Sequence, residues 1–438
     1  MTYIYEDRAY GPDVIENCYW ARTVTRPIYP SIDQDYSCDV VIVGAGFTGL
    51  SAAYHLAKDG ANVILIDAQY PAFGASGRNG GFCCLGGTMA DDAVLDRRFG
   101  PQGRRDYHQS EAQAVDLVQR LLQDLDIDPD RHSQGETCMA HRPKDAQALH
   151  GYGASHQDNY GVTSQFHSKD ELSQMGLNGQ FFGATTVPIG FALNPQKYAF
   201  GLLNAAQGLG AQIFANSTAA SIDEQGVIAN GHRITADKVI LATNGYSSET
   251  LVPWMRSRFL PVQSSILVTR PITPEEQRDQ GWTSQQMAYD TRDLLHYFRL
   301  MPDGRFLFGM RGGIFSTVKE DEKIQAEMRH NFKTMFPKWS HVDIDYNWSG
   351  LVCLTSTLLP YVGPIPDQKN VFTGFGYHGN GVAMATCSGA ILADLVQGKP
   401  PCLPYPEALK TIPKRFPFGR FRRHLLRPAY WWMRRRDA

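Results

Sequence analysis

One short segment constrains the fold more than any other: three glycines in the spacing Gly44-x-Gly46-x-x-Gly49. They follow an apolar, β-branched run at residues 39–43 and precede a stretch with helical composition. A second apolar run then ends in an acid, Asp67. Strand, glycine turn, helix and strand in this order predict a βαβ dinucleotide-binding unit.

Each part of this unit has a physical role in holding a pyrophosphate. The first glycine permits the tight turn, the second lets the backbone approach the ligand, and the third allows the helix to pack closely on the strand. The pyrophosphate is expected at the helix N-terminus, where free N–H groups and the helix dipole favour negative charge, with Phe47 and Thr48 as contacts. We expect Asp67, with Ala68 beside it, to accept a hydrogen bond from a ribose hydroxyl.

The fingerprint alone does not distinguish FAD from NAD, but the following segment favours FAD. Residues 68–82 form a long Gly/Ser/Asn/Arg loop in place of a second crossover helix, which offers many N–H donors to a flavin. The string at residues 374–379 repeats the glycine spacing, but no strand ending in an acid follows it, so we expect a glycine-lined loop closing over the flavin. Without a second complete fingerprint, the sequence favours an enzyme that takes hydride from its substrate. The expected contacts in these two loops are Ser76, Arg78, Asn79, Gly80, Gly81, Gly376, His378, Gly379, Asn380 and Gly381.

A third segment, residues 238–246, predicts a strand that ends in small polar residues beside the nucleotide. The alternative is an ordinary buried strand followed by a turn. The cofactor contacts expected from this part of the chain are Ala219, Thr243, Asn244 and Gly245.

The middle of the chain indicates antiparallel sheet. Short strands are predicted at residues 262–269, 294–300 and 305–310, and Pro-Asp-Gly at 302–304 is a hairpin signal between the last two. Helices are predicted over 105–127 and 195–207. The fold class is therefore α/β (α+β), a Rossmann-type domain with an antiparallel-sheet domain inserted. The expected boundaries are 1–37 for an N-terminal arm, 38–100, 191–250 and 348–400 for the FAD-binding domain, 101–190 for a helical insertion that belongs to the substrate domain, 251–347 for the antiparallel-sheet substrate domain and 401–438 for a basic C-terminal extension.

Composition indicates a soluble, cytoplasmic protein. The net charge is −2, eight cysteines contain no CxxC pair, and no long apolar run or secretory signal is present. Nucleic-acid binding is therefore not expected, nor is a metal site. Residues 414–438 hold nine Lys and Arg against one acid, and we expect this tail to dock on the acidic body, with peripheral membrane contact as the alternative.

Several motifs together resemble the D-amino-acid oxidase/glycine oxidase superfamily, in particular its gamma-glutamylputrescine oxidoreductase branch. The motifs are the fingerprint, Gly-Ala-Ser-Gly-Arg-Asn-Gly-Gly at 74–81, Ala-Thr-Asn-Gly-Tyr at 242–246, Trp-Ser-Gly at 348–350 with Pro-Tyr-Val-Gly-Pro at 360–364, and the loop at 374–381. The resemblance implies an FAD-binding domain interlocked with a sheet domain that holds the substrate. It implies oxidation of a C–N bond in a small amine or amino acid by hydride transfer to flavin N5. The imine is then hydrolysed, and oxygen or another acceptor reoxidises the flavin.

Few catalytic residues are expected, because the flavin carries the chemistry. Arg299 and Arg311 are the candidates for clamping a carboxylate, with a surface or ion-pair role as the alternative for each. Tyr297 alternates with His296 along its strand, so one of the two faces the cavity. His378 is a candidate in the late glycine loop, where a plain turn role is the alternative.

Some relatives attach the flavin covalently through cysteine or histidine. Cys353 lies near the corresponding region but does not match the sarcosine-oxidase pattern, and Ala383 stands where those enzymes carry a lysine. Non-covalent FAD is therefore expected. Two other functions stay open for this sequence: a membrane-associated dehydrogenase that passes electrons to quinone, and a non-catalytic FAD-containing module.

Overall fold

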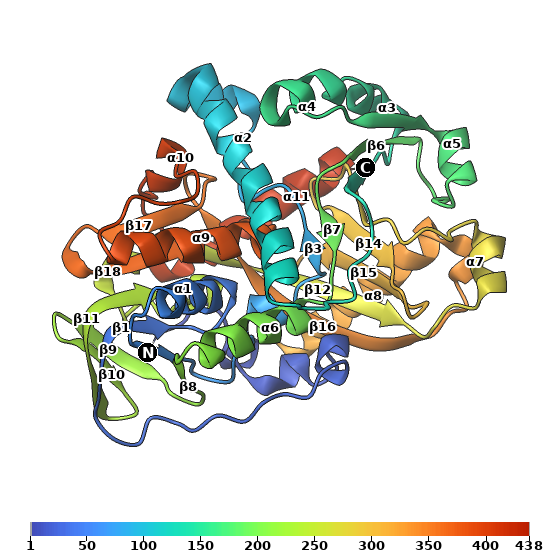
Figure 1. The fold of residues 1–438 in the computed structure, drawn as a ribbon. Coiled ribbons are helices and arrows are strands. Elements are labelled where there is room, and N and C mark those ends of the chain that lie inside the picture. The colour runs from blue at the N-terminus through green and yellow to red at the C-terminus, as the bar shows by residue number, and fades with distance from the viewer. Residues whose placement is uncertain (1, 438) are drawn as a thin grey trace.

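The computed structural model describes residues 2–437 (Figure 1). The sheet that contains the parallel strands has eight strands. Its strands are β1 (Tyr36–Val43), β2 (Val63–Ile66), β8 (Gln212–Phe214), β9 (Ala219–Asp223), β10 (Gly226–Ala229), β11 (His232–Leu241), β17 (Tyr361–Ile365) and β18 (Gln368–Phe375). The order β17-β18-β11-β1-β2-β8 places β1 between two parallel neighbours, with β10 and β9 added beside β11. This is the predicted βαβ unit, completed by strands from later in the chain.

Strand β1 is buried on both faces, which explains its unbroken apolar sequence. Val40 and Ile42 pack among the helices, and Val41 and Val43 belong to the core on the opposite face. The helices on the first face are α1 (Phe47–Lys58), α6 (Pro195–Gly208) and α9 (Gly381–Val396), and Figure 1 shows them together there. Helices α1 and α9 approach closely, because a Cβ at Gly389 would lie 2.4 Å from the Thr48 carbonyl oxygen.

The second sheet also has eight strands, in the order β16-β12-β15-β14-β13-β4-β6-β5. Their bounds are β4 (Glu136–Met139), β5 (Gln165–Ser168), β6 (Gly183–Val187), β12 (Phe259–Thr269), β13 (Ala288–Asp290), β14 (His296–Leu300), β15 (Phe306–Arg311) and β16 (Ile344–Thr355). Alternation along the strands gives the sheet two different faces. Phe298 and Phe308 pack against Phe332 of α8 (Val318–Met335). Tyr297 and Gly309 therefore point to the other face, toward the FAD-binding domain.

The remaining elements surround these sheets. Helix α2 (Asp92–Asp124) is interrupted at Gly100, where φ is +73°, just before Pro101. The other helices and strands are β3 (Phe82–Cys83), α3 (Pro143–His150), α4 (Tyr152–Tyr160), α5 (Lys169–Gln174), β7 (Phe191–Ala192), α7 (Pro274–Gln280), α10 (Glu407–Lys410) and α11 (Leu426–Asp437). The predicted fold class, both predicted helices and the hairpin at 302–304 are confirmed. None of the helices within residues 2–437 has an apolar stretch long enough to cross a bilayer.

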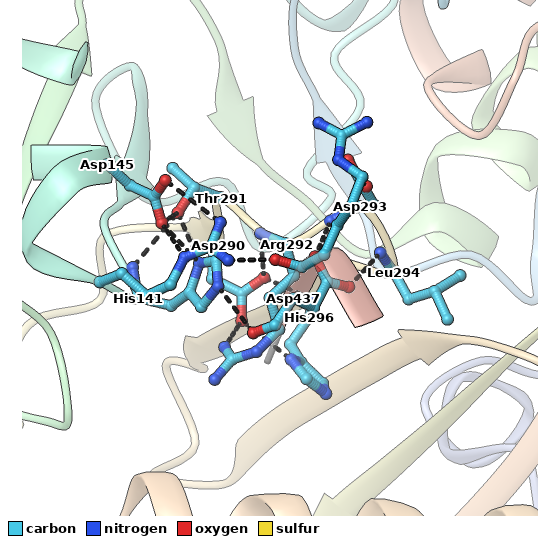
Figure 2. Close-up of polar contacts among 11 residues, drawn as sticks. His141, Asp145, Asp290, Thr291, Arg292, Asp293, Leu294, His296 and Asp437 are labelled. Carbon is cyan, nitrogen blue, oxygen red and sulfur yellow. Dashed lines mark hydrogen bonds and ion pairs between the residues drawn. The ribbon is translucent and has the colours of Figure 1, made fainter. Parts of the chain in front are cut away.

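The basic tail docks on the acidic body, as predicted. Arg422 is fully buried, and its guanidinium forms a bidentate pair with Glu249 at 2.6 and 2.9 Å. At the far end of α11, the Asp437 carboxylate accepts hydrogen bonds from the backbone N–H groups of Asp293 and Leu294 (Figure 2). Intramolecular contacts thus hold the tail against the body at Arg422 and at Asp437.

Removing one partner of the buried pair is expected to destabilise the whole chain. Glu249→Gln leaves the Arg422 guanidinium buried without a full counter-charge, so we expect the free energy of unfolding to fall by about 3 kcal/mol. Denaturant unfolding monitored by circular dichroism measures this. Glu224→Gln, on an exposed turn, is the matched control, with an expected change within about 0.5 kcal/mol. Equal stability of the two variants would contradict the assignment.

Candidate active site

A first cavity of about 300 Å³ lies at the carboxyl ends of the parallel strands. Val43 closes β1, Asp67 follows β2 and Thr243 follows β11, and all three line it. Ligands of open α/β sheets bind at this edge. The predicted cofactor contacts that line this cavity are Gly44, Gly46, Phe47, Thr48, Asp67, Ala68, Ser76, Ala219, Thr243 and Asn244.

The glycine turn places the N-terminus of α1 at this cavity. Gly44 has φ +107°, and a Cβ at Gly49 would lie 1.9 Å from the Gly44 carbonyl oxygen, so only glycine allows the turn to close. The Ser76 hydroxyl accepts a hydrogen bond from the Phe47 N–H at 2.9 Å. The amides of Thr48 and Gly49 lie in the first helical turn and have no helical acceptor. The arrangement is therefore suited to an anionic diphosphate.

Asp67 is held rigidly at the edge of the same cavity. Its Oδ2 accepts a hydrogen bond from the Ala45 N–H at 2.8 Å, and its Oδ1 accepts one from the Gln69 N–H at 2.9 Å. Burial raises the pKa of this carboxyl above its usual value. Each oxygen retains lone-pair capacity, so the fixed carboxylate can accept from a ribose hydroxyl.

A second cavity of about 340 Å³ lies between the glycine loop and the antiparallel sheet. Ala75 lines both cavities, so this residue of the glycine loop belongs to the wall of each. The predicted site residues that line the second cavity are Arg78, Asn79, Gly80, Tyr297, Arg311, Gly379 and Asn380. The two glycine loops predicted to enclose the flavin thus reach one space.

Arg78 offers a free hydrogen-bond donor in this second cavity. Its side chain is only 3% exposed, and its Nε donates to the Phe73 carbonyl at 2.6 Å. Its Nη2 is buried without a hydrogen-bond partner among residues 2–437. A buried, unsatisfied donor is costly unless a ligand completes it. This unsatisfied Nη2 donor on a cationic side chain fits the electron-rich edge of a flavin, so the residues present fit FAD.

Tyr297 is positioned by two glycines on opposite sides of its ring. A Cβ at Gly80 or at Gly309 would lie 2.8 or 2.1 Å from ring atoms. The phenol oxygen is 3.0 Å from the Ser264 hydroxyl. Burial raises the pKa of Tyr297 to about 12, so the phenol keeps its proton at neutral pH.

The two candidate arginines occupy different environments. Arg311 lines the second cavity, and its Nη2 donates to the His378 carbonyl at 2.9 Å. Burial lowers the pKa of Arg311 from its usual value. Arg299 is fully buried outside that lining, where its Nη2 donates to the Leu193 carbonyl at 2.8 Å.

The His378 side chain also lies outside both cavities. Its Nδ1 donates to the Gly87 carbonyl at 2.9 Å, and its Nε2 accepts from the Thr355 N–H at 3.2 Å. Burial lowers the pKa of His378 to about 4, so the ring is neutral. Its backbone carbonyl, rather than its ring, reaches toward the site through Arg311. The predicted residues that line neither cavity are Gly49, Gly81, Gly245, Arg299, Gly376, His378 and Gly381.

Sequence reasoning missed two acids in the wall of the second cavity. Glu111 of α2 is 2% exposed and Glu136 of β4 is 8% exposed. Burial raises the pKa of Glu136 to about 7. Glu111 carries a readable signal, because it lies on the apolar stripe that continues at Ala114, Val115 and Val118. No comparable pattern marks Glu136 within its short strand.

Comparisons with known proteins agree with this geometry. A family model described as "FAD dependent oxidoreductase" matches residues 39–395. "Probable oxidoreductase OrdL" of Rhizobium meliloti is 31% identical over 96% of each chain, and "Gamma-glutamylputrescine oxidoreductase" of Escherichia coli is 25% identical over 84% of this chain and 86% of its own. The solved structure of glycine oxidase from Geobacillus kaustophilus has a similar fold, with a TM-score of 0.70 at 20% identity over 87% of this chain and 99% of its own.

The close approach at Gly49 provides a test of the cofactor cavity. Gly49→Ala would force the turn and α1 apart, so we expect purified protein without flavin absorbance even after incubation with excess FAD. Gly208→Ala is the control, because a Cβ there meets no atom within 4 Å. That variant should keep the flavin spectrum and unfold at the same or a slightly higher denaturant concentration. A yellow Gly49→Ala protein would refute the role assigned to this turn.

The raised pKa of Glu136 predicts a dependence of stability on pH. A carboxyl with a folded pKa near 7 and an unfolded pKa of about 4.3 binds more protons in the folded state between these values. Stability contributed by Glu136 is therefore lost as pH rises through this window. Glu136→Gln removes the titration, so the variant should gain stability relative to the native chain from pH 5 to pH 8. If the unfolding free energies of the variant and the native chain differ by a constant amount from pH 5 to pH 8, Glu136 titrates normally and the prediction is wrong.

Proposed function

Because this chain belongs to the FAD-dependent oxidoreductase family, in agreement with the resemblance of its motifs, we propose that it oxidises the C–N bond of a small amine or amino acid in the second cavity. The observation that carries the proposal is that Ala75 of the glycine loop lines both cavities. A cofactor bound along the first cavity would therefore extend to the loop that forms a wall of the second. The chain is accordingly an enzyme that uses FAD.

FAD supplies the hydride acceptor, its N5 atom, and oxygen or another acceptor then reoxidises it. The residues of the chain bind and orient the substrate. Arg311 is the proposed clamp for a carboxylate, since its guanidinium lines the cavity and is fixed by the His378 carbonyl. The protonated Tyr297 phenol is the proposed hydrogen-bond partner of the substrate. Hydrolysis of the imine follows release from this site.

The cysteines support two further parts of the proposal, non-covalent FAD and a cytoplasmic location. Cys353 is 1% exposed and lines neither cavity, and burial raises the pKa of its thiol to about 12. A buried, protonated thiol is a poor nucleophile, which supports non-covalent FAD. All eight cysteines are unpaired, which supports the proposed cytoplasmic location.

Anaerobic mixing with a panel of amines, D-amino acids and N-methyl amino acids tests the proposed reaction. We expect one class to bleach the flavin absorbance. If none does so with the folded holoenzyme, the proposal fails.

Arg311→Lys tests the carboxylate clamp. Lysine keeps the charge but loses the bidentate geometry, so we expect KM for carboxylate-bearing substrates to rise about 10- to 100-fold while KM for simple amines changes little. Steady-state kinetics on matched amine and amino-acid pairs measure this. Tyr297→Phe is the companion variant, expected to affect both substrate classes alike. A uniform effect of Arg311→Lys would contradict the clamp.

A further inference from the structure

We propose that the substrate carries a second cationic group, and that the buried carboxylates of Glu111 and Glu136 bind it in the part of the second cavity that α2 and β4 line. The inference rests on the proposed function and names its substrate class: an amine with a second ammonium or guanidinium group several bonds from the reacting nitrogen. Neither carboxylate has a role in the chemistry described above.

Charge is divided between the two ends of the cavity. The Arg and Lys residues in its lining are Arg78, on the first glycine loop, and Arg311, beside Gly379. The acids in its lining are Glu111 and Glu136. Strand β4, which carries Glu136, is three strands from β15, which carries Arg311. At about 4.8 Å per step, the two strands are about 14 Å apart.

The antiparallel sheet forms a continuous floor between these ends. One cross-strand row runs through directly paired residues: Gly309, Tyr297, Tyr289, Cys138 and Thr185. Glu136 precedes Cys138 by two positions and therefore projects from the same face. An extended substrate lying along this floor would meet Arg311 and Tyr297 at one end and Glu136 at the other.

Glu111 lines the same cavity. Its Oε2 accepts from the Tyr160 hydroxyl at 2.9 Å and lies 2.8 Å from Nδ1 of His108. The Tyr107 hydroxyl is a further neighbouring donor to the carboxylate, and that hydroxyl and Oε1 are both buried. Burial, and then the charges of Glu136 and Glu111, raise the pKa of the Cys84 thiol, so this thiol lies within electrostatic range of both acids.

Nearby charges leave this end acidic. Burial opposes protonation of His108, but its contacts with Glu111 and Asp92 outweigh burial and raise its pKa. His108 is thus shared between two acids, Asp92 and Glu111, and Glu136 is additional to them. The rings of Tyr152, Tyr160 and Tyr289 line this end as well. Carboxylates among aromatic rings select an organic cation, because both interact favourably with it.

Binding of an inert dication to the holoenzyme tests the proposal without turnover. The probe is an α,ω-diguanidinoalkane, compared with the monoguanidinoalkane of the same chain length. Guanidinium groups stay protonated and offer no amine lone pair for oxidation. Titration calorimetry, with the flavin absorbance as a second readout, should give at least about tenfold tighter binding of the dication, and Glu111→Gln or Glu136→Gln should each remove most of this preference. Glu224→Gln, on the exposed turn, should leave it unchanged.

Equal affinity of the native holoenzyme for the two probes would overturn the proposal, as would an unchanged preference in both folded glutamine variants. Either result would mean that the two acids share a proton and stabilise the empty cavity. The comparison of probes on the native protein decides the matter even if a variant does not fold. Failure of the proposed oxidation is a separate outcome, because it would leave the flavin unbleached by any amine whatever the probes show.

Discussion

The close approach of the backbone at Gly44 and Gly49 sets the position of nearly every functional element. It fixes α1 against β1, and α9 in turn packs on α1 where Gly389 lies over Thr48. Helix α9 begins at Gly381, directly after the loop whose His378 carbonyl anchors Arg311. A side chain at Gly49 would therefore disturb the diphosphate site and, through α9, the substrate cavity. The two cavities are consequences of one packing constraint.

A second set of close contacts joins the two domains. The Tyr297 ring fills the space left by Gly80 of the glycine loop and Gly309 of the neighbouring strand. Arg299, fully buried, donates to the Leu193 carbonyl, and its guanidinium lies within 5.8 Å of the Phe82 ring centroid. The interface is thus built from short-range contacts on both sides of Tyr297. Such contacts hold the antiparallel sheet at a fixed distance from the glycine loop, which the proposed reaction would require.

Local signals made much of this structure predictable. The βαβ unit, the hairpin at 302–304 and the docking of the tail each depend on neighbouring residues or on charge sums, which a sequence displays directly. The environment of an individual side chain is not predictable in this way. Tyr297 and Arg299 share a face by alternation, and the Phe82 ring contacts both, yet the remote His132 lies against Arg299 and takes it out of the cavity lining. Nothing local to the strand indicates this, because the covering residues are more than 150 positions away.

The acids in the second cavity were equally hard to predict from the local sequence, and this has a functional consequence. Glu111, Glu136 and Tyr160 come from the segment between β3 and β7, whereas Arg78 and Arg311 come from the glycine loop and the central strands. The βαβ unit lines the first cavity without using that segment. Changes within the segment can therefore alter this part of the second cavity while the glycine turn and Asp67 stay in place. Under the proposed function, this separation allows one oxidation chemistry to serve substrates that differ in the group several bonds away from the reacting nitrogen.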